Sequence, residues 1–215
     1  MWFSSITFDM ADRGTRELLN ARQRLHAAVM RTSTEPREGA DRVLWRLDHK
    51  PETLFIVSPA EPDLTVLTRQ CPDATARSAP YDRFLATLSV GSRWRFRATV
   101  NPVRSLKSVG RDKQNRGKRV ALLKTSLIED WFAERGAAAG FTIPVVDGER
   151  TATVTRREHL DFAKKPNQAQ VRLATAQLEG LLEVTDADAL RTALTCGIGR
   201  ARAYGCGLLT LARLR

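Results

Sequence analysis

Cysteine is scarce in this chain of 215 residues, and long apolar runs are missing from it. The three cysteines, Cys71, Cys196 and Cys206, are an odd number and form no CxxC pair. This argues against both a disulfide framework and a zinc site. No apolar run approaches the roughly 18–20 residues that a membrane-spanning helix needs. The first residues carry an early aspartate and no basic segment before an apolar block, so we expect no signal peptide. We therefore predict a cytoplasmic protein that has no membrane partner.

The familiar catalytic motifs are missing as well. The sequence has no HExxH, GxSxG or kinase signature. Residues 110–119 resemble a Walker loop only superficially, because the glycines are too far apart and no Ser or Thr follows the lysine. Glu158, His159 and Asp161 are close in sequence, but adjacent strand positions point to opposite faces and no partner cluster exists elsewhere. We expect no metal site and no cofactor, and we find no residue set for a metabolic enzyme with a small anionic substrate.

Acidic residues are outnumbered, 24 to 35, by lysine and arginine, which gives a formal net charge of +11. Such an excess favours a polyanionic partner, of which nucleic acid is the commonest. The alternative is an incidentally basic protein from an arginine-rich proteome. Distribution favours the first reading: residues 101–119 hold seven Lys or Arg against one Asp, and residues 191–215 hold five Arg and no acid. Clustered cations near glycines suit a phosphate backbone, because each neutralised phosphate releases counterions.

Hydrophobic periodicity predicts an α+β fold of two tandem ferredoxin-like (RRM-like) βαββαβ units. The first unit has strands at 1–8, 42–47, 54–57 and 93–100, helices at 15–32 and 81–88, and an irregular connection at 61–79 that includes a short strand at 64–67. The second has strands at 118–123, 141–146, 150–157, 169–185 and 207–214, and helices at 125–139 and 187–194, with Asp186 as a cap. We place the domains at 1–100 and 120–215, joined by a basic linker at 101–119.

The strand at 93–100 shows strict alternation. Trp94, Phe96, Ala98 and Val100 share one face, and three arginines with a threonine occupy the other. This period of two predicts a half-buried strand. Its outer arginine row is either a solvated face or a nucleic-acid platform, and the strand alone favours the solvated face.

His26 lies within the first predicted helix, in a basic stretch rather than an apolar one. Arg22, Gln23 and Met30 are its neighbours at helical spacing. A histidine that titrates near neutrality can take a proton from a hydroxyl or give one to a leaving oxygen. The alternative is a surface histidine on a cationic helix, and the residues alone favour that alternative.

Residues 197–207, here called the glycine loop, carry four glycines spaced G-x-G-x5-G-x-G with Arg200 and Arg202 among them. Glycine permits positive φ and lets backbone N–H groups approach phosphate oxygens, while the arginines pair with them. A dinucleotide fingerprint is excluded, because that loop follows a strand and opens a helix, whereas this one does the reverse. We interpret the loop as a phosphate cradle; the alternative is a flexible turn.

Several segments together resemble a known family. They are the opening MWFSSITFD, LHAAV with His26, VLWRL at 43–47, RFRATVNP at 95–102, GKRVALLK at 117–124, and the terminal GIGRARAYGCGLLTLAR. In this order and over almost the whole length, the chain resembles the CRISPR-associated endoribonucleases of the CasE type, which process crRNA in type I-E Cascade complexes. The resemblance implies two ferredoxin-like domains and metal-independent cleavage of a CRISPR repeat stem-loop. It implies CRISPR repeat RNA and other Cascade subunits as partners.

The resemblance also assigns roles. It makes His26 the catalytic histidine and Arg31 a cation near the scissile phosphate, where relatives can carry a lysine. It places Arg156 and Arg157 on the basic hairpin, at 155–165, that relatives insert into the RNA stem. Gln23 departs from the pattern, since some relatives carry a tyrosine there and an amide is no comparable acid or base.

The expected chemistry suits these residues independently of the family. The 2′-OH of RNA is its own nucleophile, so the protein needs only a proton-transfer group and fixed cations. His26 with Arg31 or Arg22 could supply both. The full set of expected RNA-binding residues is Arg22, Lys107, Lys118, Arg119, Arg156, Arg157, Gly199, Arg200 and Arg202. The alternative function is a non-catalytic RNA hairpin-binding module of the same fold.

Overall fold

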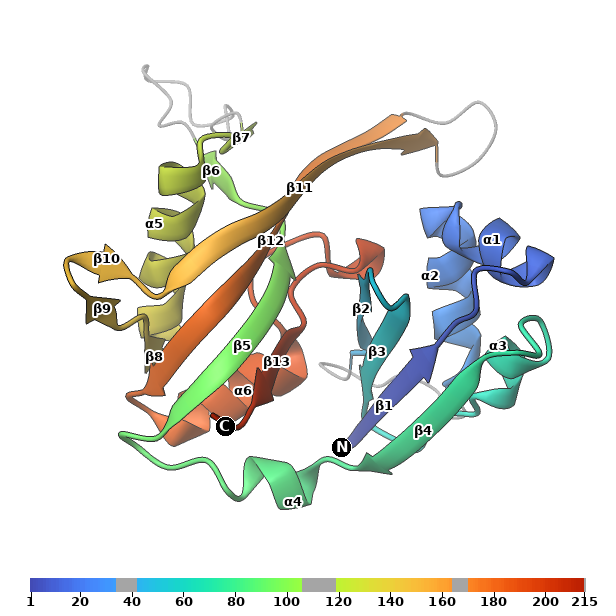
Figure 1. The fold of residues 1–215 in the computed structure, drawn as a ribbon, viewed down its shortest axis with the longest axis horizontal. Coiled ribbons are helices and arrows are strands. Elements are labelled where there is room, and N and C mark those ends of the chain that lie inside the picture. Colours follow the sequence, from blue (N-terminus) through green and yellow to red (C-terminus); the bar gives the residue numbers. More distant parts are fainter. Residues whose placement is uncertain (34–41, 106–118, 164–169, 215) are drawn as a thin grey trace, which may run out of the picture.

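In the computed structural model, which describes residues 1–33, 42–105, 119–163 and 170–214, two antiparallel sheets lie side by side. The first sheet has the order β2-β3-β1-β4 and the second β11-β12-β5-β13 (Figure 1). Each sheet has the strand order of one ferredoxin-like unit. The prediction of two tandem ferredoxin-like units is therefore confirmed.

The first unit runs along the chain as β1, α1, α2, β2, β3, α3, β4. Its elements are β1 (Trp2–Thr7), α1 (Arg13–Leu19), α2 (Arg22–Arg31), β2 (Leu44–Asp48), β3 (Thr53–Ser58), α3 (Thr65–Thr68) and β4 (Thr75–Pro80), followed by α4 (Asp82–Leu85). The one long helix expected at 15–32 is divided in two. The Asp12 side chain accepts hydrogen bonds that begin α1, and Asn20 ends it before α2 begins. Residues 64–67, expected as a strand, begin α3, and β4 was missed because its exposed side chains show no alternation.

The second unit runs β5, α5, β11, β12, α6, β13. These elements are β5 (Arg93–Val100), α5 (Thr125–Ala138), β11 (Ala152–Ala163), β12 (Gln170–Val184), α6 (Ala187–Cys196) and β13 (Leu209–Ala212). Asp186 caps α6 as predicted. Short strands β6 (Val103–Ser105) and β7 (Arg119–Ala121) pair as a ribbon, β8 (Phe141–Thr142) pairs with β12, and β9 (Val145–Val146) pairs with β10 (Glu149–Arg150).

The assignment of 93–100 to the first unit is wrong. β5 pairs with β12 and β13 in the centre of the second sheet, and β4 closes the first sheet instead. The division between sheets therefore falls between α4 and β5, not at residue 100. Residues 103–105 and 119–121 pair as the β6–β7 ribbon, which follows β5, so the expected linker falls after the first strand of the second unit.

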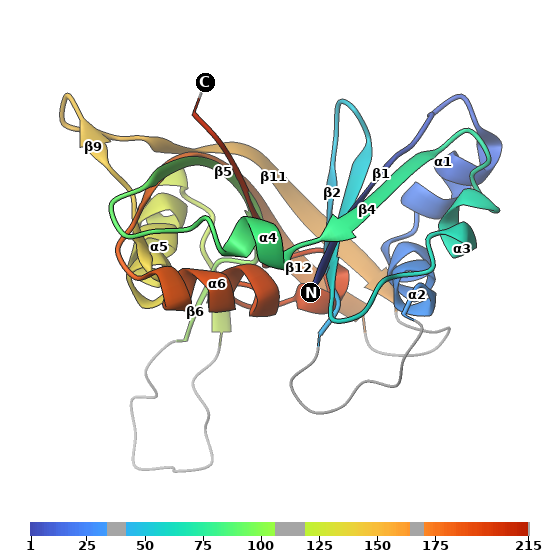
Figure 2. The ribbon, with the colours of Figure 1, turned by 90° about the horizontal axis from the view of Figure 1, so that it is seen from below.

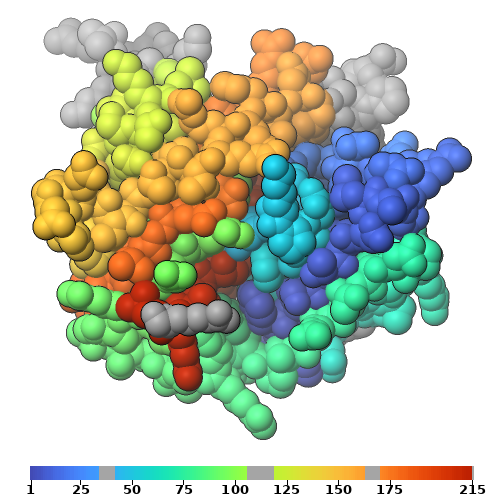
Figure 3. Space-filling view, viewed as in Figure 1, coloured from blue at the N-terminus to red at the C-terminus, as the bar shows by residue number. Residues whose placement is uncertain are grey.

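Each unit has its own core. In the second, α5 and α6 lie against one face of the sheet (Figure 2), where the buried residues of β5 alternate as predicted. In the first, Leu25, Ala28 and Val29 of α2 pack on the sheet through Ile6, Trp45 and Ile56. The space-filling view shows the β2–β3 hairpin standing between the N-terminal segment and the long strands of the second sheet (Figure 3). The β11–β12 arm reaches from the second sheet toward α2 (Figure 1).

Within the described residues, no helix is long and apolar enough to cross a membrane.

Candidate functional site

His26 lies where α2, the glycine loop and the β11–β12 arm come together. Its side chain is half-buried, next to the buried Leu25 that anchors α2 on the first sheet. The imidazole and the Tyr204 ring are 6.2 Å apart between centroids, at an interplanar angle of 53°. Phe162 of β11 meets the other side of Tyr204 edge-on, with centroids 4.9 Å apart. An aromatic series thus connects the two units at His26, and tilted or edge-on contacts of this kind are favourable.

The sequence placed Tyr204 in the glycine loop but could not show its contact with His26, because it is 178 positions after His26 in the chain. It belongs to a 3₁₀ turn, Arg202–Tyr204, flanked by left-handed Ala201 and Gly205. Gln23, one helical turn before His26, is half-buried, and its Oε1 accepts no hydrogen bond from the described residues. The tyrosine beside His26 is therefore Tyr204 of the glycine loop, while position 23 of α2 carries a glutamine.

The two expected cations differ in their relation to His26. Arg22 lies four residues before it, on the same helical face. Arg31, the last residue of α2, is exposed and lies five residues after it, about 140° around the helix axis. Arg22 is thus the better aligned cation, although the role of either in catalysis stays a prediction.

Glu158 of β11 binds several of the expected RNA contacts. Its carboxylate accepts from Arg22 Nη2 at 3.0 Å and pairs with Arg156 Nη2 at 2.6 Å, and His49 Nε2 lies 3.8 Å away. We call these four residues the Glu158 cluster. Burial lowers the pKa of His49, with Arg156 acting in the same direction and Glu158 opposing it. The cluster joins α2, the β2–β3 turn and the arm, so the charges of Arg22 and Arg156 are paired with one carboxylate.

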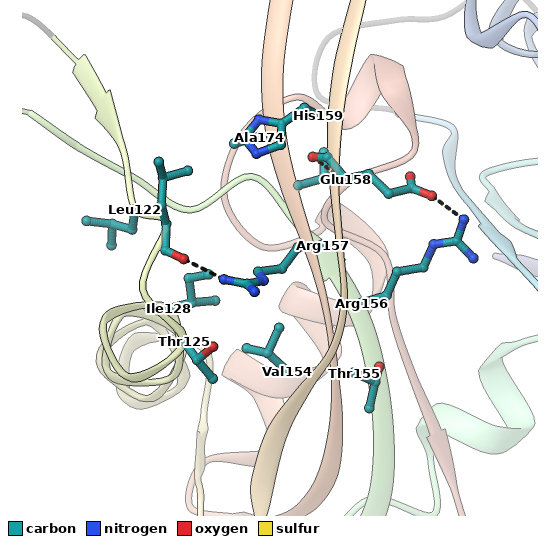
Figure 4. Close-up of a pocket in the computed structure, with 12 residues that line it drawn as sticks. Leu122, Thr125, Ile128, Val154, Thr155, Arg156, Arg157, Glu158, His159 and Ala174 are labelled. Carbon is teal, nitrogen blue, oxygen red and sulfur yellow. Dashed lines mark hydrogen bonds and ion pairs between the residues drawn. The ribbon is translucent and has the colours of Figure 1, made fainter.

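Arg156 and Arg157 leave β11 on opposite faces (Figure 4). The register between β11 and β12 shifts between Val154 and Arg156. Arg157 donates to the Leu123 carbonyl oxygen at 2.9 Å, whereas Arg156 turns toward Glu158. Both arginines, with Ile128, are among the residues that line a pocket of about 590 Å³. Their side chains diverge from the strand, and their role in reading the RNA stem stays a prediction.

The glycine loop packs closely on the protein. Gly205 has φ +81°, and a Cβ there would lie 2.8 Å from the Trp45 ring. Gly199 has φ +78°, and its Cβ would lie 3.0 Å from Trp131. Both positions therefore require glycine because a larger side chain would collide with a tryptophan ring. Such close packing does not fit the flexible turn that was the alternative from the sequence. Binding of phosphate by the loop stays a prediction.

The remaining expected RNA contacts are spread out. Arg200 is exposed, and the half-buried Arg202 donates through Nη2 to the Gly197 carbonyl at 3.0 Å. Arg119 is exposed on β7, paired with Ser105 of β6. Lys107 and Lys118 lie outside the described residues.

The arginine row of β5 is partly neutralised. Arg93 Nε pairs with Glu183 at 2.7 Å, and Arg97 pairs with Asp48 at 2.9 Å and with Glu179 at 3.0 Å. Both arginines are therefore occupied within the fold, which favours the solvated face over a nucleic-acid platform. Within the described part of the chain, no group of three or more His, Cys, Asp or Glu residues is arranged to hold a metal ion.

Comparison with known proteins gives consistent matches over the full length. The family model described as CRISPR associated protein matches residues 1–213. The CRISPR-associated endoribonuclease Cse3 of Thermus thermophilus is 28% identical over 223 residues, covering 99% of this chain and 100% of the relative. The structure of Thermus thermophilus Cse3 bound to an RNA representing a pre-cleavage complex has a TM-score of 0.82 at 26% identity, covering 99% of this chain and 98% of that one. A chain of a CRISPR RNA-guided surveillance complex, pre-nicking, has a TM-score of 0.68 at 27% identity, with both chains fully covered. Because the family model spans nearly every residue, this chain belongs to the family of CRISPR-associated proteins.

Proposed function

We propose that this chain is a metal-independent endoribonuclease that binds the stem-loop of CRISPR repeat RNA and cleaves the precursor transcript to crRNA. We propose further that it acts in the cytoplasm and stays bound to its product as a Cascade subunit. Similarity to Cse3, an endoribonuclease solved with RNA, supports the first proposal, and similarity to a chain of a surveillance complex supports the role as a Cascade subunit.

The observation that carries the proposal is the position of His26. Its imidazole is held against Tyr204 at the place where the cationic arm of the second unit meets α2 of the first. A histidine on a solvated helix face, the alternative that the residues alone favoured, would need no aromatic partner from a distant loop. Arg22 and Arg156 lie around the same junction, joined by Glu158.

The reaction needs little more than these groups. The 2′-oxygen attacks the adjacent phosphorus, the bond from phosphorus to the 5′-oxygen breaks, and the products are a 2′,3′-cyclic phosphate and a 5′-OH end. One proton leaves the 2′-OH and one is delivered to the 5′-oxygen; His26 performs one of these two transfers. A guanidinium beside the phosphate stabilises the negative charge that develops on its oxygens, and Arg22 and Arg31 are the candidates.

The test is cleavage of end-labelled repeat RNA in EDTA under single-turnover conditions, with the termini mapped. We expect a cyclic phosphate, and no cleavage when the nucleotide before the scissile phosphate is 2′-deoxy. His26→Ala should slow cleavage by about 10²–10⁴-fold, as for loss of an acid–base group, with RNA affinity retained. Arg83→Ala removes an exposed side chain of α4, outside the expected RNA-binding residues, and is the control.

Three results would contradict this mechanism. They are inhibition of the parent by EDTA, parental cleavage by His26→Ala, and cleavage of the 2′-deoxy RNA. A parent that binds the hairpin selectively but never cuts it would instead establish the non-catalytic hairpin-binding module.

A further inference from the structure

A basic pocket of about 920 Å³ lies beside the glycine loop, formed by residues that the loop, β6 and α5 bring together. Five arginines line it: Arg42, Arg104, Arg135, Arg200 and Arg202. Glu134 is its one acidic lining residue among those the structure describes. Its ion pair with Arg104 spans 3.7 Å between two side chains that are more than half exposed, so it neutralises little. The pocket therefore carries an excess of about four positive charges.

Several hydrogen-bond donors in this pocket have no acceptor. Trp131 is 4% exposed, and its Nε1–H has no partner among the described residues. The same holds for Nε of Arg202. Within the described chain, no backbone carbonyl accepts from the N–H groups of Gly199, Arg200 or Ala201. Ala201 is left-handed, a conformation that occurs in backbone nests that bind anions.

Unpartnered donors beside clustered guanidinium groups fit a ligand rich in anionic oxygens. The Trp131 and Arg202 nitrogens are buried from solvent, so a ligand in the pocket would meet the guanidinium groups and the backbone N–H groups of residues 199–201 instead. The other lining groups point away from a base-stacking site, because the Arg135 guanidinium covers the Trp131 ring at 5.6 Å. The recognised chemistry is thus the phosphate backbone rather than the bases.

The pocket adjoins the His26 site through the chain itself. Arg202 lines the pocket, and Tyr204, two residues on, contacts the His26 ring. Two residues span at most about 7.6 Å between Cα atoms. A strand that leaves the cleavage site past Tyr204 therefore meets the pocket within roughly one nucleotide. The pocket volume of about 920 Å³ is that of a site for a small ligand or a short segment of chain, which favours a single strand over a whole duplex.

We propose that this pocket binds the phosphates of a single-stranded segment adjoining the cleaved bond, as a second RNA site separate from the one that holds the stem. The inference rests on the proposed function. The glycine loop then has two roles: Tyr204 packs against His26, and residues 199–202 bind the flanking single strand.

The experiment compares affinities for three RNAs that carry a non-cleavable 2′-deoxy substitution at the scissile position. One is the stem-loop alone, one has a single-stranded 5′ extension, and one has a 3′ extension. The test variant is Arg104→Ala/Arg135→Ala, two arginines whose side chains are exposed. The matched control is Arg77→Ala/Arg83→Ala, two exposed arginines on β4 and α4. Circular dichroism checks that each variant is folded.

We expect the test variant to bind one extended RNA about tenfold more weakly, with affinity for the stem-loop alone within twofold of the parent. The log–log salt dependence for that extended RNA should flatten by about 0.7 for each single-strand phosphate that the variant no longer neutralises. The control should leave all three affinities unchanged. Equal loss on all three RNAs, or no loss on any, would overturn the proposal. Cleavage of unmodified stem-loop RNA by the parent tests the proposed function separately, since it needs no extension.

Discussion

Arg46 is the side chain through which the two sheets are most directly connected. It lies on β2, is 1% exposed, and pairs with Asp48 through Nε at 2.6 Å and Nη2 at 3.0 Å. It also donates across the junction to the carbonyls of Arg97 and Leu208 and to the Thr210 hydroxyl. We predict that Arg46→Met, which keeps the aliphatic length and removes the donors, is strongly destabilising.

The magnitude follows from what the substitution leaves behind. Burial lowers the pKa of Arg46 and the Asp48 carboxylate opposes that effect, so each charge depends on the other. Without Arg46, the buried Asp48 keeps its ion pair with Arg97, whose side chain is partly exposed. Removing one partner of a buried ion pair costs about 3–5 kcal/mol, and here the carbonyls of Arg97 and Leu208 also lose their donor, which offsets the partner that Asp48 keeps. At roughly 2–4 °C per kcal/mol for a chain of this size, the melting temperature should fall by roughly 6–20 °C.

The assay is urea denaturation followed by circular dichroism, together with the double variant Arg46→Met/Asp48→Leu. Because the double variant removes both charges, it should lose less stability than Arg46→Met alone. Loss of the connection should also separate the unfolding of the two units, so that probes in each unit give different transitions. A loss in the free energy of unfolding of less than about 1 kcal/mol for Arg46→Met, the typical effect of any point mutation, would refute the reasoning. So would a double variant whose loss equals the sum of the losses of Arg46→Met and Asp48→Leu measured separately.

Three further predictions concern the site. Tyr204→Ala should slow single-turnover cleavage about tenfold or more with stem-loop affinity unchanged, because His26 loses the ring that packs against it. Tyr204→Phe keeps the ring and should cleave at the parental rate. An equal loss of rate in both variants would point to the hydroxyl instead. Glu158→Gln should free two arginines, which raises RNA affinity and steepens the log–log salt dependence of binding by up to about 0.9 for each additional phosphate that they neutralise. Glu183→Gln, at a pair remote from α2, is the control. Unchanged affinity would mean that the ion pairs of the Glu158 cluster persist when RNA binds. Gly205→Ala should lower the free energy of unfolding by about 2–5 kcal/mol, because the new Cβ meets the Trp45 ring and the backbone has positive φ. Gly148→Ala, where φ is positive but the space is open, should lower it only by the cost of the left-handed conformation. Equal losses in thermal melts would exclude the packing effect.

The fold could be predicted because local periodicity carries most of it. Alternation in β5, the Asp186 cap and the amphipathic α6 are properties of neighbouring residues. The sheet to which β5 belongs was not predictable in this way, since strand pairing is a contact between segments far apart in the chain. β4 had no signal because its outward side chains are exposed and its pattern lacks alternation.

For the candidate site too, local patterns could be read from the sequence and contacts between distant segments could not. Composition and the glycine loop indicated a nucleic-acid partner, and the family resemblance pointed to His26. Neither could place Tyr204 on His26, or show that Glu158 pairs with Arg22 and Arg156.

The sequence by itself determined most of the secondary structure, the fold class and the sign of the partner's charge, because these depend on side-chain type and on spacing along the chain. Only the tertiary structure decided which cations are available to RNA and which are neutralised within the fold. Arg22 and Glu158 are 136 positions apart in sequence and 3.0 Å apart in space. Coulomb energy depends on that distance and on burial, and neither is written in the order of the residues.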